Sequence, residues 1–182
     1  KSSAAFRTAV SLQSDMLSAR YGLASALIET GETETCRDIC MALVQSGNTA
    51  PQIVRLLARA EMELSDFASA EPHLHQAISA GSGEALKDYA NLLWMTGREE
   101  DADVLLRGAA SAAAERPHQA LMAFDEWLDM ERPERVVAAF DHLPAELKND
   151  PIFLSRLSMA QSDLGEAESG YALAERAGLA VP

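Results

Sequence analysis

The sequence has few cysteines, few aromatic residues and few positive charges, and each shortage excludes a class of protein. Two cysteines in 182 residues cannot form a disulfide framework. A net charge of −13 would repel phosphate backbones and anionic lipids, so we expect neither broad nucleic-acid binding nor attachment to a membrane surface. No stretch approaches the roughly 18 consecutive apolar residues of a spanning helix, so membrane insertion is not expected either.

Motifs for catalysis and cofactor binding are also missing. The sequence contains no P-loop, no HExxH zinc motif, no nucleophile elbow and no glycine-rich dinucleotide-binding turn. Acidic residues are plentiful, but they are expected near helix starts and on outer faces, where they favour helix formation and solubility. The sequence therefore predicts a chain that is not an enzyme and needs no cofactor.

The residues that are abundant favour helices. Hydrophobic residues make up 48% of the chain and aromatic residues only 5%. Alanine and leucine recur throughout while β-branched residues are sparse, which predicts an all-α fold. The chain begins at Lys1 rather than at methionine, so we expect it to be a processed or excised piece of a longer protein.

An internal repeat with an offset of 34 residues runs through the sequence, as segment 23–47 aligned with segment 57–81 shows. Later copies have their turns at Gly97, at Glu131 or Arg132 in a degraded copy, and at Gly165. Each copy contains two apolar-periodic segments of about a dozen residues around a turn. This pattern predicts a series of antiparallel helix pairs.

The repeat predicts how the chain is organised. Residues 1–13 match the second helix of a truncated leading repeat, because Phe6, Ala9 and Val10 occupy the apolar positions of that helix. The full copies are expected at about 14–47, 50–81, 82–115, 117–144 and 150–179. Helix starts agree with this division, since Asp150 before Pro151 offers an N-cap and a first-turn proline.

Small residues recur where the two helices of each copy would cross: Ala24, Ala58 and Ala90 in first helices, and Cys36, Ala70, Ala102 and Gly170 in second helices. With a glycine and an acidic residue at the turn, this 34-residue unit resembles the tetratricopeptide repeat (TPR). The best matches are "ELSDFASAEPHLHQAI" and "MTGREEDADVLLRGA". The resemblance implies a right-handed superhelical solenoid of about five helix pairs preceded by one helix. The degraded fourth copy is expected to be shorter.

Cys36 and Cys40 lie four residues apart, a spacing that suits either a reactive site or packing on one helix face. Their equivalents in the next copy are an alanine and a leucine, which predicts that both thiols are buried and inert. A zinc site would need further ligands, and His73 and His75 are two residues apart and cannot share a helix face. We therefore expect no metal.

The resemblance implies that a partner binds the concave surface, which first helices line in this family. Offsets from the turn place Arg55 and Arg59 there on one first helix, and Lys87 and Asn91 on the next. We expect these four donors, with no acid between them, to hold a carboxylate or an acidic peptide. The spacing of Lys87 and Asn91 resembles part of the carboxylate clamp of some TPR domains, although Tyr21 stands where a full clamp has another lysine.

Tyr21, Met62 and Trp94 complete the predicted peptide-binding set. Met62 and Trp94 either supply apolar contacts beside the donors or belong to the core between repeats. The basic residues also have an alternative, which is that Arg55, Arg59 and Lys87 pair with neighbouring glutamates such as Glu61, Glu63 and Glu84.

The sequence thus predicts a non-catalytic scaffold that binds a peptide or protein segment, with an acidic or C-terminal carboxylate group, in its concave groove. One alternative is the regulatory or substrate-presenting arm of a larger enzyme. Another is self-association into a homo-oligomer through ends marked by Phe6 and Leu179. The alanine-rich, acidic composition is compatible with a bacterial cytoplasm or periplasm, and the unpaired thiols favour the cytoplasm.

Overall fold

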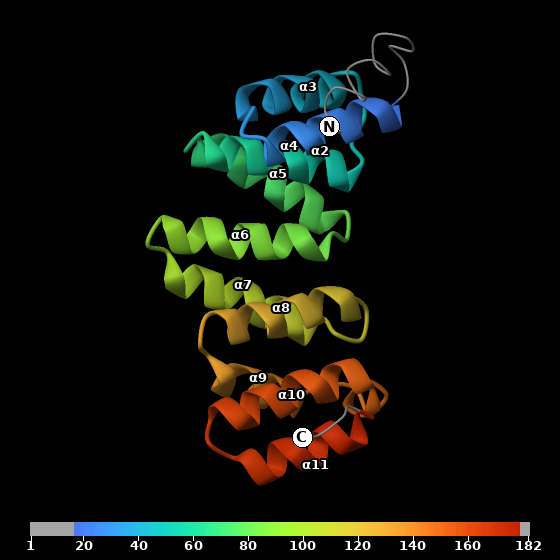
Figure 1. The fold of residues 1–182 in the computed structure, drawn as a ribbon, viewed down its shortest axis with the longest axis vertical. Coiled ribbons are helices and arrows are strands. Elements are labelled where there is room, and N and C mark those ends of the chain that lie inside the picture. Colours follow the sequence, from blue (N-terminus) through green and yellow to red (C-terminus); the bar gives the residue numbers. More distant parts are fainter. Residues whose placement is uncertain (1–16, 179–182) are drawn as a thin grey trace. The chain divides into compact units, whose positions relative to one another are not determined.

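The computed structural model describes residues 17–178, and this part of the chain consists of α-helices joined by short turns, without a strand (Figure 1). Within the same residues, no helix is both long enough and apolar enough to cross a membrane. The helices are α2 (Leu17–Glu29), α3 (Thr33–Gln45), α4 (Pro51–Glu63), α5 (Phe67–Ser79), α6 (Gly83–Met95), α7 (Glu99–Ser111), α8 (Pro117–Asp129), α9 (Pro133–Phe140), α10 (Pro151–Asp163) and α11 (Ala167–Arg176), with a 3₁₀ turn η1 at Leu147–Asn149.

Two compact units divide the chain, an N-terminal unit up to Leu92 and a C-terminal unit from Leu93. The described part of the N-terminal unit contains α2 to α5 and most of α6, and the C-terminal unit contains the end of α6 and α7 to α11. The predicted leading helix at 1–13, with Phe6, and the predicted contact at Leu179 lie outside the described residues. The predicted all-α helical repeat is confirmed, while its right-handed winding and the limits of its repeats stay predictions.

In the N-terminal unit, α2 packs on α3, α3 on α4 and α4 on α5, and the first helices α2 and α4 also contact each other directly. Leu27, Cys36 and Leu57 are completely buried between these helices. Burial of such apolar side chains supplies most of the stability of a helical repeat, because each helix pair covers the apolar face of its neighbour.

The small residues predicted at the helix crossings are all buried. Gly170 shows why size matters there: a Cβ atom on Gly170 would lie 2.6 Å from Ser162 Oγ and 3.0 Å from the Ser158 carbonyl oxygen. The Ser158 hydroxyl also donates a hydrogen bond to the Gly170 carbonyl oxygen at 2.7 Å. Helices α10 and α11 therefore approach too closely for a larger residue at this crossing.

The turn between the two helices of a pair needs a residue with positive φ. Glycine supplies it in three of the turns, with φ of 78° at Gly31, 73° at Gly97 and 84° at Gly165. Ser65, with φ of 61°, and Glu131, with φ of 56°, occupy the same place in the other two pairs. Since side chains disfavour this conformation, these two turns store backbone strain.

In the fourth copy only the second helix is short, because α8 and α10 still begin 34 residues apart, at Pro117 and Pro151. Its first helix α8 is regular and buries Phe124 and Trp127, but its second helix α9 has 8 residues where α3, α5 and α7 each have 13. Pro144 follows soon after α9 and cannot continue a helix, because it lacks a backbone N–H group. The chain instead reaches α10 through η1, and Asp150 caps α10 by accepting a hydrogen bond from the Ile152 N–H at 2.8 Å.

Candidate functional site

The predicted binding residues form a stripe on each of two first helices. On α4, Arg55, Arg59 and Met62 are half-buried and follow one another at a helical spacing of four and then three residues. The other α4 residues from Ile53 to Glu61 are buried. Between Ile53 and Glu61, Arg55 and Arg59 are therefore the only α4 side chains that the fold leaves partly open.

The matching stripe on α6 consists of Lys87, Asn91 and Trp94, at the same spacing. Asn91 is exposed, whereas Lys87 and Trp94 are half-buried. Lys87 is engaged in an interaction of its own. Asn91 thus presents its amide to solvent without being covered by the fold.

An ion pair ties the two stripes together. Arg55 Nε lies 2.5 Å from Asp88 Oδ2, and a second contact joins Arg55 Nη2 to Asp88 Oδ1 at 3.4 Å. Both side chains are mostly shielded, with 29% of Arg55 and 15% of Asp88 exposed. The two-point geometry fixes α4 beside α6, because an arginine and a carboxylate matched in this way resist rotation.

This ion pair corrects the expectation that no acid lies between the four donors. Asp88 follows Lys87 directly and neutralises Arg55. The predicted alternative, in which glutamates pair with the cations, is also wrong for Arg55, whose partner is an aspartate on another helix. Glu61 instead meets His73 and Glu63 accepts a hydrogen bond from Thr33.

Arg59, unlike Arg55, has no acidic partner among the described residues. It lies one turn further along α4 and makes no hydrogen bond or ion pair with any residue that the structure describes. Asn91 lies one turn beyond Lys87 on α6. Arg59 and Asn91 thus each lie about one turn beyond the ion pair of Arg55 and Asp88 on their own helices.

Tyr21 joins the same surface from α2. Tyr21 and Arg55 both line an open pocket of about 320 Å³, whose other walls are the start of α4 and the turn before α6. Glu84 also lines this pocket, so its charge is mixed. The pocket is thus a shallow polar depression with an arginine and a glutamate in its walls.

Trp94 is held in a contact within the C-terminal unit. Its indole Nε1 donates to Met130 Sδ at 2.9 Å, and the Arg132 guanidinium carbon lies 5.9 Å from the ring centroid. The ring therefore packs against the end of α8 by a cation–π contact and a hydrogen bond. This geometry favours the alternative left open by the sequence, in which Trp94 belongs to the packing between repeats.

The two cysteines are packing residues, as predicted. Both are free thiols, and both are completely buried. A hydrogen bond with Cys36 and burial raise the pKa of the Cys40 thiol above its ordinary value, so this thiol stays protonated at neutral pH. A protonated, inaccessible thiol is neither a nucleophile nor a metal ligand.

The two histidines have separate partners. His73 Nδ1 lies 2.8 Å from Oε2 of the buried Glu61, and His75 Nε2 lies 3.0 Å from the Tyr89 hydroxyl. Burial raises the pKa of Glu61, and the hydrogen bond with His73 opposes part of that rise. In the described part of the chain, no group of three or more His, Cys, Asp or Glu residues could hold a metal ion.

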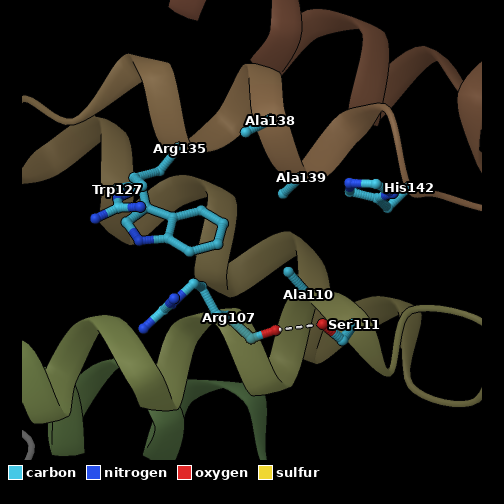
Figure 2. A pocket seen from close by; sticks show the side chains of 8 residues that line it. All are labelled: Arg107, Ala110, Ser111, Trp127, Arg135, Ala138, Ala139 and His142. Atoms are coloured by element: carbon cyan, nitrogen blue, oxygen red, sulfur yellow. Dashed lines mark hydrogen bonds between the residues drawn. The ribbon is translucent and has the colours of Figure 1, made fainter.

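Sequence reasoning missed a pocket of about 210 Å³ among α7, α8 and α9 of the C-terminal unit. Figure 2 shows the Trp127 ring near Arg107 and Arg135, with His142 at the opposite end and alanines along the walls. Arg107 and Arg135 lie on second helices, and the search for binding residues followed first helices. The two arginines lie at different offsets from their turns, ten residues after Gly97 and four after Glu131, so the repeat pattern gave no signal for the pocket.

Comparison with known proteins identifies the fold. No protein-family model matches the chain, and no curated protein matches it either. The solved structure of YrrB, described as a TPR protein with an unusual peptide-binding site, matches with a TM-score of 0.52 and 13% identity, over 95% of this chain and 90% of YrrB.

A second solved structure is the C-terminal part of a TPR repeat-containing protein from Cytophaga hutchinsonii, with a TM-score of 0.50 and 14% identity. The match covers 86% of this chain and 63% of that structure. At identities this low, the likeness concerns the fold alone. This chain has a TPR-like all-α repeat fold, and the resemblance predicted from the sequence is confirmed at that level.

Proposed function

We propose that the chain is a non-catalytic scaffold that binds an extended peptide or protein segment across α2, α4 and α6. The observation that carries this proposal is the pair of stripes on α4 and α6, held side by side by Arg55 and Asp88. Two helices joined by an ion pair, with polar side chains along each, suit an extended partner whose backbone and side chains they can contact in several places.

The positive charge of Arg59 indicates that the partner carries a negative group at this place. Arg59 has no acid paired with it among the described residues, and Asn91 adds an exposed amide donor. A guanidinium and an amide one helix apart are donors for a carboxylate, and a charge-assisted hydrogen bond from arginine is stronger than a neutral one. We therefore propose an acidic side chain or a C-terminal carboxylate as the group that this seam recognises.

The groups with shifted pKa support a role without catalysis. Glu61 and Cys40, whose pKa values are raised, and Cys36, whose pKa a hydrogen bond with Cys40 lowers, all lie inside the helix packing, where no substrate reaches them. A catalytic acid or nucleophile must lie at an accessible surface. YrrB, which shares the fold, is described as having a peptide-binding site, and this agrees with a peptide as the partner. The unpaired thiols favour a cytoplasmic location.

The test is a calorimetric titration of the whole chain with a set of extended peptides, each made with a free and with an amidated C-terminus. We expect binding that needs a carboxylate and weakens as salt is added. Arg59→Gln should reduce the affinity about tenfold or more, because a hydrogen bond to a charged group is lost.

The matched control is Arg116→Gln, which removes the same charge from an exposed position before α8. It should leave peptide affinity unchanged, and far-UV circular dichroism should show equal helicity for both variants. Equal binding by wild type and Arg59→Gln, or equal binding of peptides with and without carboxylates, would remove the proposal.

A further inference from the structure

The pocket in the C-terminal unit has a built polar end. Asp103 on α7 accepts from three donors: Trp127 Nε1 lies 3.3 Å from Oδ1, and Arg107 Nε and Arg135 Nη2 lie 3.2 Å and 3.1 Å from Oδ2. Arg107, Arg135 and Trp127 line the pocket. Asp103 does not, and no other carboxylate is among its lining residues. Two guanidinium groups that share one carboxylate leave a net positive charge at this end.

One donor at this end lacks an acceptor. The Nε–H group of Arg135 is buried from water and has no hydrogen-bond partner in the described part of the chain. Leaving a buried charged donor unsatisfied is costly, so such groups call for an explanation. A bound acceptor oxygen near Arg135 would remove the cost.

The rest of the pocket is mainly apolar, with Ser111 and His142 as its other polar residues. Figure 2 shows its walls on either side of the Trp127 ring, formed by Ala138 and Ala139 of α9 and by Ala110 and Ser111 of α7. Its volume of about 210 Å³ exceeds the roughly 150 Å³ of an engineered cavity that holds benzene. The pocket therefore has room for one aromatic or branched aliphatic group, and not for a large ligand.

We propose that this pocket binds a carboxylate that is attached to a small apolar or aromatic group. The carboxylate would accept from Arg107 and Arg135, and the apolar group would pack on Trp127 and the alanines. An inorganic anion would use the arginines but leave the apolar walls exposed to water, so it fits less well. The carboxylate has two sources, a free small acid and the last residue of a peptide.

The test uses three probes: N-acetylphenylalanine, N-acetylphenylalaninamide and the tripeptide Ala-Ala-Phe. The readout is the indole N–H signal of Trp127 in ¹⁵N nuclear magnetic resonance, with the Trp94 signal as an internal control. We expect N-acetylphenylalanine to shift the Trp127 signal and not that of Trp94, and the amide to bind at least about tenfold more weakly.

Two variants distinguish the pocket from the rest of the surface. Arg107→Gln removes one guanidinium, and Ala138→Leu fills the pocket from an exposed position while it keeps both arginines. Each should weaken N-acetylphenylalanine binding about tenfold or more, while Arg116→Gln should not change it.

A comparison of the affinities of N-acetylphenylalanine and Ala-Ala-Phe identifies the source of the carboxylate. Stronger binding of the tripeptide assigns the pocket to a peptide C-terminus, and stronger binding of N-acetylphenylalanine assigns it to a small acid. Equal binding of the acid and its amide, or binding that survives Ala138→Leu, would overturn the proposal. These variants leave α4 and α6 unchanged, so failure here is separate from failure of the peptide scaffold.

Discussion

The two units use arginine in different ways. In the N-terminal unit, Arg55 is matched one to one by Asp88, and the charges cancel. In the C-terminal unit, Arg107 and Arg135 share Asp103, and one positive charge remains. The distribution of carboxylates, rather than the number of arginines, therefore determines which arginines keep an uncancelled positive charge.

The C-terminal unit also contains a one-to-one pair. Arg156 Nε on α10 lies 2.6 Å from Asp125 Oδ1 on α8, and α8 and α10 are neighbouring first helices. Arg55 and Asp88 likewise join two first helices, α4 and α6, although here the arginine is on the earlier helix. One-to-one pairs therefore align first helices in each unit, whereas the shared aspartate leaves donors over for a ligand.

The largest expected effect comes from breaking the shared site. Asp103→Asn should lower the free energy of unfolding by about 2 kcal/mol, because three donors lose a charged acceptor and two guanidinium groups are left to repel each other. Asp88→Asn should cost about 1 kcal/mol, since it strands a single guanidinium that water reaches. Urea unfolding followed by far-UV circular dichroism measures both losses.

Binding separates the two substitutions further. With the Asp103 charge removed, both arginines become available, and N-acetylphenylalanine should bind several-fold more tightly to Asp103→Asn. Asp88→Asn should leave that affinity unchanged. If the two substitutions had the same effects on stability and on binding, the distinction between matched and shared arginines would be lost.

A smaller effect concerns Glu61, a buried acid whose partner is His73. Burial raises the folded-state pKa of Glu61, so the folded state favours the protonated form. The stability that follows is fully present below the ordinary glutamate pKa of about 4.3 and is lost as the pH rises through the raised value. His73 and Arg37 oppose this shift and Asp66 adds to it.

Glu61→Gln removes the titrating group and should flatten this dependence. Near pH 4 the variant and wild type should unfold at similar urea concentrations, and near pH 8 the variant should unfold at a higher urea concentration than wild type. Glu63→Gln, on the same helix with an exposed side chain, is the matched control and should follow wild type. A wild type that gains stability relative to Glu61→Gln between these pH values would contradict the assignment.

The sequence predicts well what depends on local chemistry. Ala24, Ala58 and Ala90 each lie seven residues before the turn residue of their copy, and all three are completely buried. The turn position is equally local, because a residue at each helix end must adopt positive φ. Such features are repeated in every copy, so one copy helps to identify the next.

The candidate sites depend on more than one helix, and there the sequence was less informative. Asp88 lies about 100° around the helix from Lys87, close enough to the same surface to reach Arg55, but turn offsets assigned the surface to Lys87 and Asn91 alone. The pocket at Trp127 lies among α7, α8 and α9, and the packing of three helices determines the space between them. A single sequence gives the end of α9 through Pro144 but not that space.

The smallest expected effects concern the two turns that lack glycine, one in each unit. Ser65 follows the C-cap of α4 and Glu131 follows that of α8, and both adopt the left-handed conformation that glycine adopts in the other pairs. Ser65→Gly and Glu131→Gly should each raise the free energy of unfolding by about 0.5 kcal/mol, because relief of strain exceeds the added chain entropy of glycine. The gain should be larger at Glu131, whose side chain is bulkier.

Thermal unfolding measures both gains, and Gly31→Ala and Gly97→Ala serve as reciprocal controls that should destabilise by about 1 kcal/mol. Neither turn residue contacts Asp103, Arg107 or Arg135 in the described part of the chain, so binding of N-acetylphenylalanine should not change. A loss of stability at Glu131→Gly would mean that its side chain contributes a contact worth more than the strain. The four variants together test whether turn geometry is independent of the way in which each unit distributes its charges.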